Sequence, residues 1–222
     1  MNAMSSMIPR KTNEEHDTDL PIALEPLLHR SSDDDRPVVV MTCGIAGSGK
    51  STLAKAIIQK RPSFTRLSTD EIIFERHGLY GVDYPADEEL YAQYQVKQDE
   101  IFLDTFQKLL ERGKDVILDK SFYAKEDRDG YKTMIEEAKA RWILVYLKAG
   151  DKEQLWQRIL ARSKKAKEDN NALMISRDTF EMYWTGFEAP VDEGEVAISS
   201  DINSIGTLQH VITVADKSDK AL

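Results

Sequence analysis

The chain has 222 residues, of which 41% are apolar and 31% charged, and its formal net charge is −9. This length and apolar content suffice for one α/β domain with a sizeable buried core. Residues 1–36 hold eight acidic and four basic side chains, so the remainder carries −5. Such a balance gives no general attraction to a nucleic-acid backbone or an anionic membrane, and we expect neither as a partner.

The single cysteine, Cys43, cannot form an intramolecular disulfide, and its place at the end of an apolar run indicates a small buried side chain. No stretch approaches the ~18 consecutive apolar residues of a membrane helix, and the start of the chain has no apolar segment behind basic residues. We therefore expect a soluble, cytoplasmic protein. The sequence leaves its oligomeric state open.

Composition divides the chain into three parts. Residues 1–36 predict a largely disordered extension, 37–216 a single domain, and 217–222 a frayed tail. Within the extension, "LPIALEPLLH" (20–29) is apolar enough to dock on the domain, although a detached segment is equally compatible with the pattern.

Strands and helices alternate along the domain. The run "VVVMTC" (38–43) is continuously apolar and predicts a strand that is buried on both faces, at the centre of a parallel sheet. Further strands are expected at 64–68, 115–119, 141–147, 196–200 and 210–215, and helices at 50–61, 69–78, 88–111, 124–140, 151–162 and 177–187. This order predicts an α/β fold with helices on both faces of a parallel sheet.

The segment "TCGIAGSGKS" (42–51) contains G-x-x-x-x-G-K-[ST] between a predicted strand and a predicted helix. Glycines let backbone N–H groups approach phosphate oxygens at the positive end of a helix. Lys50 would neutralise the terminal phosphates, and Ser51 would offer its hydroxyl to Mg²⁺. The expected nucleotide-binding residues are Gly44, Gly47, Ser48, Gly49, Lys50, Ser51 and Thr52. A glycine-rich turn without a ligand is the alternative.

Two aspartates follow the strands expected beside this loop, namely Asp70 and Asp119. Because ligands of open parallel sheets bind outside the carboxyl ends of the strands, both carboxylates should face the phosphate chain. Asp119 would help to hold Mg²⁺, and its alternative is a solvated acid. Asp70 would accept a proton from an acceptor hydroxyl. Alternatively, Thr69 or Asp70 only caps the following helix.

A basic run without acids crosses the end of the helix at 151–162 and includes Arg158 and Arg162, which share a helix face. We expect a lid at about 163–177 that brings these guanidinium groups to the transferring phosphoryl group and excludes water. Cations that only complement the helix dipole are the alternative.

Taken in order, "GIAGSGKST", "RLSTDEI", "VILDKSFYAKEDR", "LVYLKAGDKEQLWQRILAR" and "FEAPVDEGE" resemble the ATP-dependent P-loop kinases that are grouped with polynucleotide kinase, zeta toxin, chloramphenicol phosphotransferase and gluconate kinase. The resemblance implies a P-loop NTPase fold with a five-stranded parallel sheet and a helical lid. It also implies ATP and Mg²⁺ as cofactors, with Lys50, Asp70, Arg158 and Arg162 as catalytic residues and Ser51 and Asp119 at the metal.

The sequence gives fewer indications of which molecule accepts the phosphoryl group. Relatives that act on nucleotide hydroxyls tend to have an arginine three residues after the catalytic aspartate, whereas this chain has Ile73 there and its nearest arginine is Arg76. Asp70, Arg76, Tyr84 and Arg128 are the candidate substrate-binding residues. For Arg128 a solvated helix position, and for Tyr84 simple packing, are the alternatives.

These observations predict a kinase that transfers the γ-phosphoryl group of ATP to a hydroxyl of a small molecule. The alternatives are a 5′-hydroxyl polynucleotide kinase and a non-catalytic, toxin-like ATP-binding module.

Overall fold

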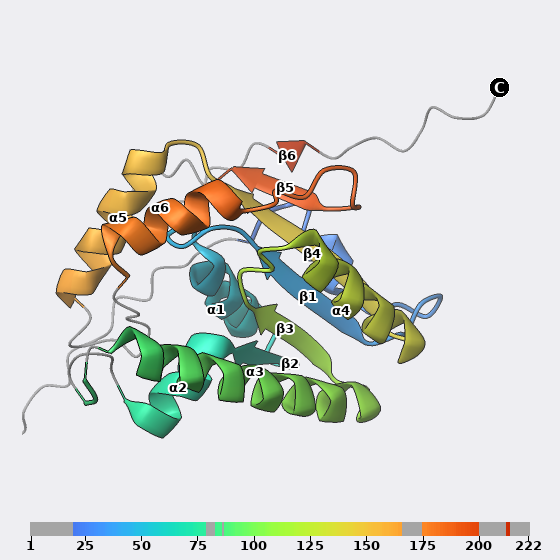
Figure 1. Ribbon diagram of the computed structural model, residues 1–222. Helices are drawn as coiled ribbons and strands as arrows, with labels where there is room; N and C mark the ends of the chain where they lie inside the picture. The colour runs from blue at the N-terminus through green and yellow to red at the C-terminus, as the bar shows by residue number, and fades with distance from the viewer. Residues whose placement is uncertain (1–19, 79–82, 86, 166–174, 200–211, 214–222) are drawn as a thin grey trace, which may run out of the picture.

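The computed structural model describes residues 20–78, 83–85, 87–165, 175–199 and 212–213, and the statements below concern these residues. Figure 1 shows a central sheet with helices packed on both faces and α5 and α6 beyond one end of the strands. The elements are the 3-10 helix η1 (Glu25–Leu28), β1 (Val38–Cys43), α1 (Lys50–Lys60), β2 (Phe64–Ser68), α2 (Thr69–His77), α3 (Glu88–Glu111), β3 (Asp115–Asp119), α4 (Lys125–Glu137), β4 (Arg141–Lys148), α5 (Lys152–Lys165), α6 (Arg177–Gly186), β5 (Val196–Ser199) and β6 (Ile212–Thr213).

The sheet has the strand order β2-β3-β1-β4-β5-β6. The first five strands pair in parallel, which confirms the predicted five-stranded parallel sheet, and β6 adds a short antiparallel edge to β5. At the centre, Val40 of β1 is in register with Ile117 of β3 and Ile143 of β4. The carboxyl ends of the parallel strands therefore meet at one edge, where the loops that follow them can build a shared site.

Strand β1 is buried along its whole length, as its continuous apolar run predicts. Because side chains alternate across a strand, Val38 and Val40 pack with α1, whereas Val39 and Met41 pack with α3 and α4. Cys43 is fully buried at the end of β1, and burial raises the pKa of its thiol to about 11. It is thus a core side chain, as expected.

The segment at residues 20–36 packs against the face of the sheet that carries α1. Leu20, Leu24 and Leu28 are buried in the same core cluster as β1 and α1. Arg30 adds polar contacts, because its Nη2 atom lies 2.7 Å from Oδ1 of Asp115 and 2.8 Å from the carbonyl oxygen of Gly113. Of the two alternatives for "LPIALEPLLH", the structure shows docking, so the packed domain begins upstream of the boundary that we expected at Pro37.

Helices α5 and α6 pack on each other beyond the sheet edge. Leu155 and Ile159 of α5, Phe180 of α6 and Ile45 of the loop after β1 form a separate buried cluster. This cluster fixes α5, and with it the basic residues at its C-terminal end, beside the glycine-rich loop. None of the described helices has the length and apolar content that a bilayer-spanning segment needs.

Candidate active site

The loop between β1 and α1 is built to receive an anion. Gly44, Gly47 and Gly49 all have positive φ angles, which side chains other than hydrogen disfavour. A Cβ atom on Gly44 would lie 2.8 Å from Oγ of Ser48 and 2.9 Å from the carbonyl oxygen of Leu147. Gly49 is the N-cap of α1 and provides no side-chain cap, so the positive end of this helix is left to a ligand. These features fit a phosphate chain.

A second feature of the loop is an unpaired polar atom. The hydroxyl oxygen of Ser48 is buried and has no hydrogen-bond partner among the described residues. Buried polar atoms are normally paired, so this unpaired hydroxyl marks the loop as a place where the fold leaves a polar atom unsatisfied.

Lys50 opens α1 and lies among carboxylates. Its Nζ atom donates to the carbonyl oxygen of Ile45 at 3.0 Å. Burial lowers the pKa of the Lys50 ammonium, and the negative charges of Asp119 and Asp70 oppose this effect. A desolvated ammonium gains most from a nearby phosphate, which matches the predicted role of Lys50.

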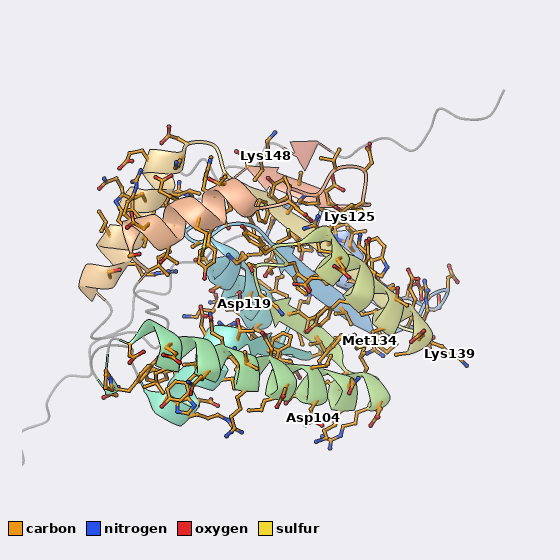
Figure 2. The ribbon with its side chains drawn as sticks, viewed as in Figure 1. Asp104, Asp119, Lys125, Met134, Lys139 and Lys148 are labelled. Carbon is orange, nitrogen blue, oxygen red and sulfur yellow. The ribbon has the colours of Figure 1, made fainter. Side chains whose placement is uncertain are left out.

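Asp119 at the end of β3 is held by Arg66 of β2. The Nη2 and Nε atoms of Arg66 lie 2.7 and 3.0 Å from Oδ2 of Asp119, whose side chain is 3% exposed. The other oxygen, Oδ1, accepts from the Ser51 hydroxyl at 3.3 Å. Figure 2 shows Asp119 at the carboxyl end of its strand. Ser51 and Asp119 are thus adjacent, as a shared Mg²⁺ requires, whereas the described residues contain no cluster of three or more acidic, histidine or cysteine ligands.

Asp70 is not the cap of α2. The N-cap is Ser68, whose Oγ atom accepts from the backbone N–H of Glu71 at 3.4 Å, so the capping alternative for Thr69 and Asp70 is wrong. Asp70 lines the cavity described below. Asp70 is an exposed residue of the cavity wall, but its recessed position there raises the pKa of its carboxyl; the negative charge of Asp119 adds to the rise, and Lys50 and Arg162 oppose it. A carboxylate with a raised pKa is a better proton acceptor.

A cavity of about 360 Å³ joins these groups at the edge of the sheet. Its lining includes Ala46 and seven predicted site residues from the loop, α1, α2 and β3, namely Gly47, Gly49, Lys50, Ser51, Thr52, Asp70 and Asp119. Gly44 and Ser48 are buried and do not line it. The structure therefore brings the predicted phosphate, metal and proton-acceptor residues to one cavity.

The two predicted arginines of α5 are placed differently. Arg162 lines the cavity, and its charge acts on both Lys50 and Asp70. Arg158 does not line it, and its Nη2 atom donates to Gln154 at 3.1 Å. The predicted lid at 163–177 falls mostly on residues 166–174, outside the described part of the chain. On either side of that segment, Arg162 and Ile175 both line the cavity.

Arg76 and Tyr84 do not line the cavity either. Arg76 is exposed in the last turn of α2. Tyr84 packs edge-on against Tyr94 and His77, with ring centroids 5.3 and 6.4 Å apart. The packing alternative for Tyr84 therefore describes the structure, and we leave both residues out of the site.

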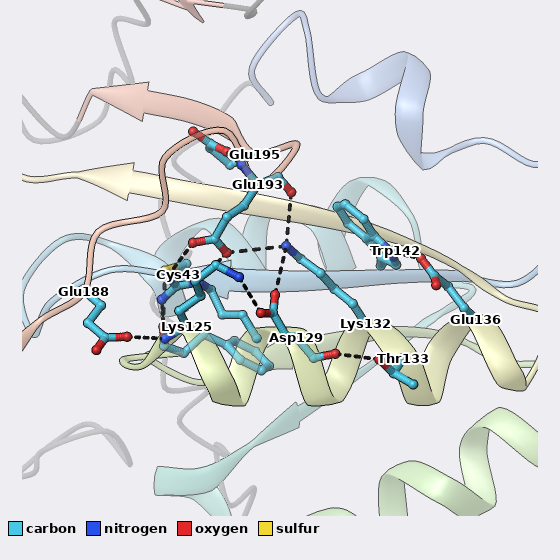
Figure 3. Close-up of polar contacts among 12 residues, drawn as sticks. Cys43, Lys125, Asp129, Lys132, Thr133, Glu136, Trp142, Glu188, Glu193 and Glu195 are labelled. Atoms are coloured by element: carbon cyan, nitrogen blue, oxygen red, sulfur yellow. Dashed lines mark hydrogen bonds and ion pairs between the residues drawn. The ribbon is translucent and has the colours of Figure 1, made fainter.

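Arg128 is fully buried and does not line the cavity. Its Nη2 and Nε atoms lie 2.6 and 2.8 Å from the two carboxylate oxygens of Glu193, and Nη1 donates to the carbonyl oxygen of Phe122 at 2.9 Å. Figure 3 shows Glu193 above α4, where Lys132 also reaches it. Neither predicted alternative, substrate contact or solvated residue, describes Arg128, which is instead half of a buried ion pair.

Several residues at or beside the cavity were not singled out from the sequence. In the sequence Arg66 is an ordinary residue of a predicted strand. Its role is to hold the carboxylate of Asp119, which lies 53 positions away. From α3 come Gln95, Gln98 and Asp99, from the loop after β3 come Lys120, Ser121 and Tyr123, and α6 supplies Tyr183. The sequence signal was only their position after a predicted strand or in a predicted helix.

Comparison with known families agrees with this geometry. The family model described as an AAA domain matches residues 39–183. The chain belongs to this family. The segment includes the glycine-rich loop, both aspartates and Arg162, and the resemblance to P-loop kinases stated from the motifs is confirmed. A search of the curated proteins found no match.

Two solved structures share the fold of this AAA-domain protein. A protein from Chloroflexus aurantiacus j-10-fl, to which a kinase activity is attributed, has a TM-score of 0.56 at 20% identity, covering 73% of this chain and 84% of that chain. A chain of the Pnkp1/Rnl/Hen1 RNA repair complex has a TM-score of 0.54 at 19% identity, covering 68% of this chain and 44% of that chain. At these identities the similarity establishes the P-loop kinase fold alone.

Proposed function

We propose that this protein is an ATP- and Mg²⁺-dependent phosphotransferase that moves the γ-phosphoryl group to a hydroxyl of a small molecule. The observation that carries the proposal is the shared cavity, in which Asp70 lies with Lys50 of the phosphate loop and with Ser51 and Asp119. A protein that only bound a nucleotide would have no need of the Asp70 carboxylate beside the phosphate loop, because a carboxylate repels an anionic ligand.

The residues present account for a balanced transfer. Asp70 takes the proton of the acceptor hydroxyl as its oxygen bonds to the γ-phosphorus, and the bond from that phosphorus to the bridging oxygen breaks, releasing ADP. Lys50 and Arg162 offset the negative charge of the transferring group. Proton transfer of this kind contributes roughly 10²- to 10⁴-fold to a rate.

Ser51 and Asp119 fit a bound Mg²⁺. Mg²⁺ takes oxygen ligands and usually keeps several waters, so one hydroxyl and one carboxylate beside the phosphates suffice. When bound, the ion offsets phosphate charge and helps to orient the phosphate chain. Arg66 holds the Asp119 carboxylate by its Oδ2 atom and leaves Oδ1 directed to Ser51.

A 5′-hydroxyl polynucleotide kinase is the competing function, since one chain with this fold comes from an RNA repair complex. Against it stands the position three residues after Asp70, where Ile73 lines the cavity and Arg76 does not. The overall charge of −9 also disfavours a polyanion.

The test is transfer of label from γ-labelled ATP to a mixed library of small hydroxyl compounds and to a 5′-hydroxyl oligonucleotide. We expect label in a small molecule with wild-type protein and transfer slowed by about 10²- to 10⁴-fold with Asp70→Asn, while ATP affinity changes little. Asp104→Asn is a matched control, because Asp104 lies exposed on α3 outside the cavity (Figure 2). Equal transfer by Asp70→Asn and wild type would remove the proposed role, and label in the oligonucleotide alone would favour the competing function.

A further inference from the structure

The part of the cavity wall that α3 contributes has an unpaired polar group. Gln98 lines the cavity and is 4% exposed, and its Oε1 atom has no hydrogen-bond partner among the described residues. A buried amide oxygen without a partner is unfavourable, so it is expected to find one in a ligand. A side-chain amide offers both an acceptor and donors, and it pairs well with a hydroxyl group.

The neighbouring part of the cavity wall consists of amide, phenol and hydrocarbon groups. Gln95 hydrogen-bonds to Tyr183, and both residues line the cavity together with Tyr123 and Ile73. Phenol rings and an isoleucine side chain offer apolar surface, while the phenol and amide groups offer hydrogen bonds. Such a mixture suits a compound with C–H faces and several hydroxyls.

The charges of this wall favour no charged group on the acceptor. From α2, α3 and the loop after β3, the cavity receives the carboxylates of Asp70 and Asp99 and the ammonium of Lys120. Lys120 is already engaged, because its Nζ atom lies 3.4 Å from Oδ1 of Asp99 and 5.8 Å from the ring centre of Phe102. With Asp119, Lys50 and Arg162 included, the described lining holds three carboxylates and three cations, so it offers no excess charge to a phosphate or to an ammonium group on the acceptor.

We infer that the acceptor is an uncharged polyhydroxyl compound without phosphate, of the sugar or sugar-alcohol class, and that Gln98 binds one of its hydroxyls beside Asp70. This inference rests on the proposed phosphotransferase function. It names the substrate class of the same cavity and adds Gln98 as a specificity-determining residue.

The first test compares acceptors with wild-type protein and γ-labelled ATP. The panel holds pentoses, hexoses and their alcohols, the corresponding sugar phosphates, amino sugars, and a 5′-hydroxyl oligonucleotide. We expect the best uncharged compound to exceed its phosphorylated and amino counterparts in kcat/KM by roughly tenfold or more, as one well-placed interaction allows. A higher kcat/KM for a sugar phosphate, an amino sugar or the oligonucleotide would overturn the inference.

The second test replaces the amide. Gln98→Leu keeps a side chain of similar size and should raise KM for the best acceptor by roughly tenfold, the value of one hydrogen bond, with ATP affinity nearly unchanged and the melting temperature equal or higher. Gln98→Glu retains an acceptor oxygen and should restore part of the loss. Gln107→Leu, at an exposed position of α3 outside the cavity, is the matched control. An unchanged KM in Gln98→Leu would contradict the assignment.

Failure of this inference and of the proposed function are distinguishable. If label moves to a charged acceptor and Asp70→Asn strongly slows that transfer, the phosphotransferase function stands and only the acceptor class is wrong. If no compound takes the label and Asp70→Asn leaves the slow hydrolysis of ATP unchanged, both fall.

Discussion

Asp70 illustrates how a functional residue reduces the stability of the fold that holds it. Its recessed position in the cavity wall raises the pKa of its carboxyl, so the folded protein binds this proton more tightly than the unfolded chain does. The stability from this group is therefore complete below the ordinary carboxyl pKa and is lost as pH rises through the raised value. At neutral pH the ionised Asp70 is a net cost.

Asp70→Asn should therefore raise the melting temperature at pH 7, by about 2–4 °C for each kcal/mol gained. The gain should shrink as pH falls from 7 through the raised pKa toward the ordinary carboxyl value of 3.8, because the carboxyl then becomes protonated in the folded wild type. Calorimetry of wild type, Asp70→Asn and Asp104→Asn across this pH range measures the effect. A lower melting temperature for Asp70→Asn at pH 7 would show that the carboxylate stabilises the fold instead.

The same carboxylate sets the acid limit of activity. Because Asp70 must be ionised to accept a proton, kcat/KM should fall as pH drops through a pKa above the ordinary value of 3.8. A pH profile of the transfer reaction checks this. Constant activity down to pH 4 would show that another group takes the proton.

A substitution of Lys50 tests the phosphate loop through ATP binding, without a transfer reaction. With ATP at 100 times its dissociation constant, binding should add about 2.7 kcal/mol to the free energy of unfolding of wild-type protein. Lys50→Ala should lose most of this ATP-dependent stabilisation, since the desolvated ammonium has no substitute in the loop. Thermal melts with and without ATP measure it, with Lys55→Ala, an exposed lysine of α1, as control. Undiminished stabilisation of Lys50→Ala would contradict the loop assignment.

At the scale of elements, the buried pair of Arg128 and Glu193 ties two loops to α4. Phe122 accepts from Arg128 and from the Cys43 thiol, and Glu188 accepts from the backbone N–H of Lys125 (Figure 3). The loop after β3, which brings Lys120, Ser121 and Tyr123 to the cavity, is thereby anchored at its far end. Arg128 acts on the site through this loop.

Arg128→Ala leaves the carboxylate of Glu193, 5% exposed, without its main partner. We expect a loss of about 3–5 kcal/mol in the free energy of unfolding, as for other broken buried pairs, measured by urea denaturation. The control is Arg36→Ala, which breaks the exposed pair with Asp34 and should cost at most about 1 kcal/mol. Replacing both Arg128 and Glu193 by leucine should recover part of the loss. Equal costs for the two alanine variants would refute a structural role for Arg128.

The elements themselves were predictable where one local signal dominated. The continuous apolar run of β1 and the glycine pattern after it determine a buried strand and a phosphate loop without help from distant residues. The helix from Glu88 to Glu111 was also predicted with the bounds that the structure has. In contrast, the cap of α2 is Ser68, not Thr69 or Asp70, because several capping residues stand in a row and local preference does not separate them.

At the scale of the whole molecule, residues are brought to the site by contacts between parts of the chain that are far apart in the sequence. Arg66 meets Asp119, Arg128 meets Glu193, and α3 delivers Gln98 to a cavity that begins at the loop after β1. No spacing rule identifies these pairs, since each depends on strand order and helix packing. For the same reason Arg76, Arg128 and Tyr84 seemed suitable for substrate in the sequence and lie outside the cavity in the structure.

The single-turnover rate of phosphoryl transfer tests the central claim most directly, because it isolates the chemical step in a cavity that holds both phosphate loop and carboxylate. It would be measured with enzyme saturated by γ-labelled ATP and with the best acceptor, for wild type and Asp70→Asn. We predict a fall of about 10²- to 10⁴-fold in Asp70→Asn with the ATP dissociation constant nearly unchanged. Transfer at the wild-type rate in Asp70→Asn would contradict the account.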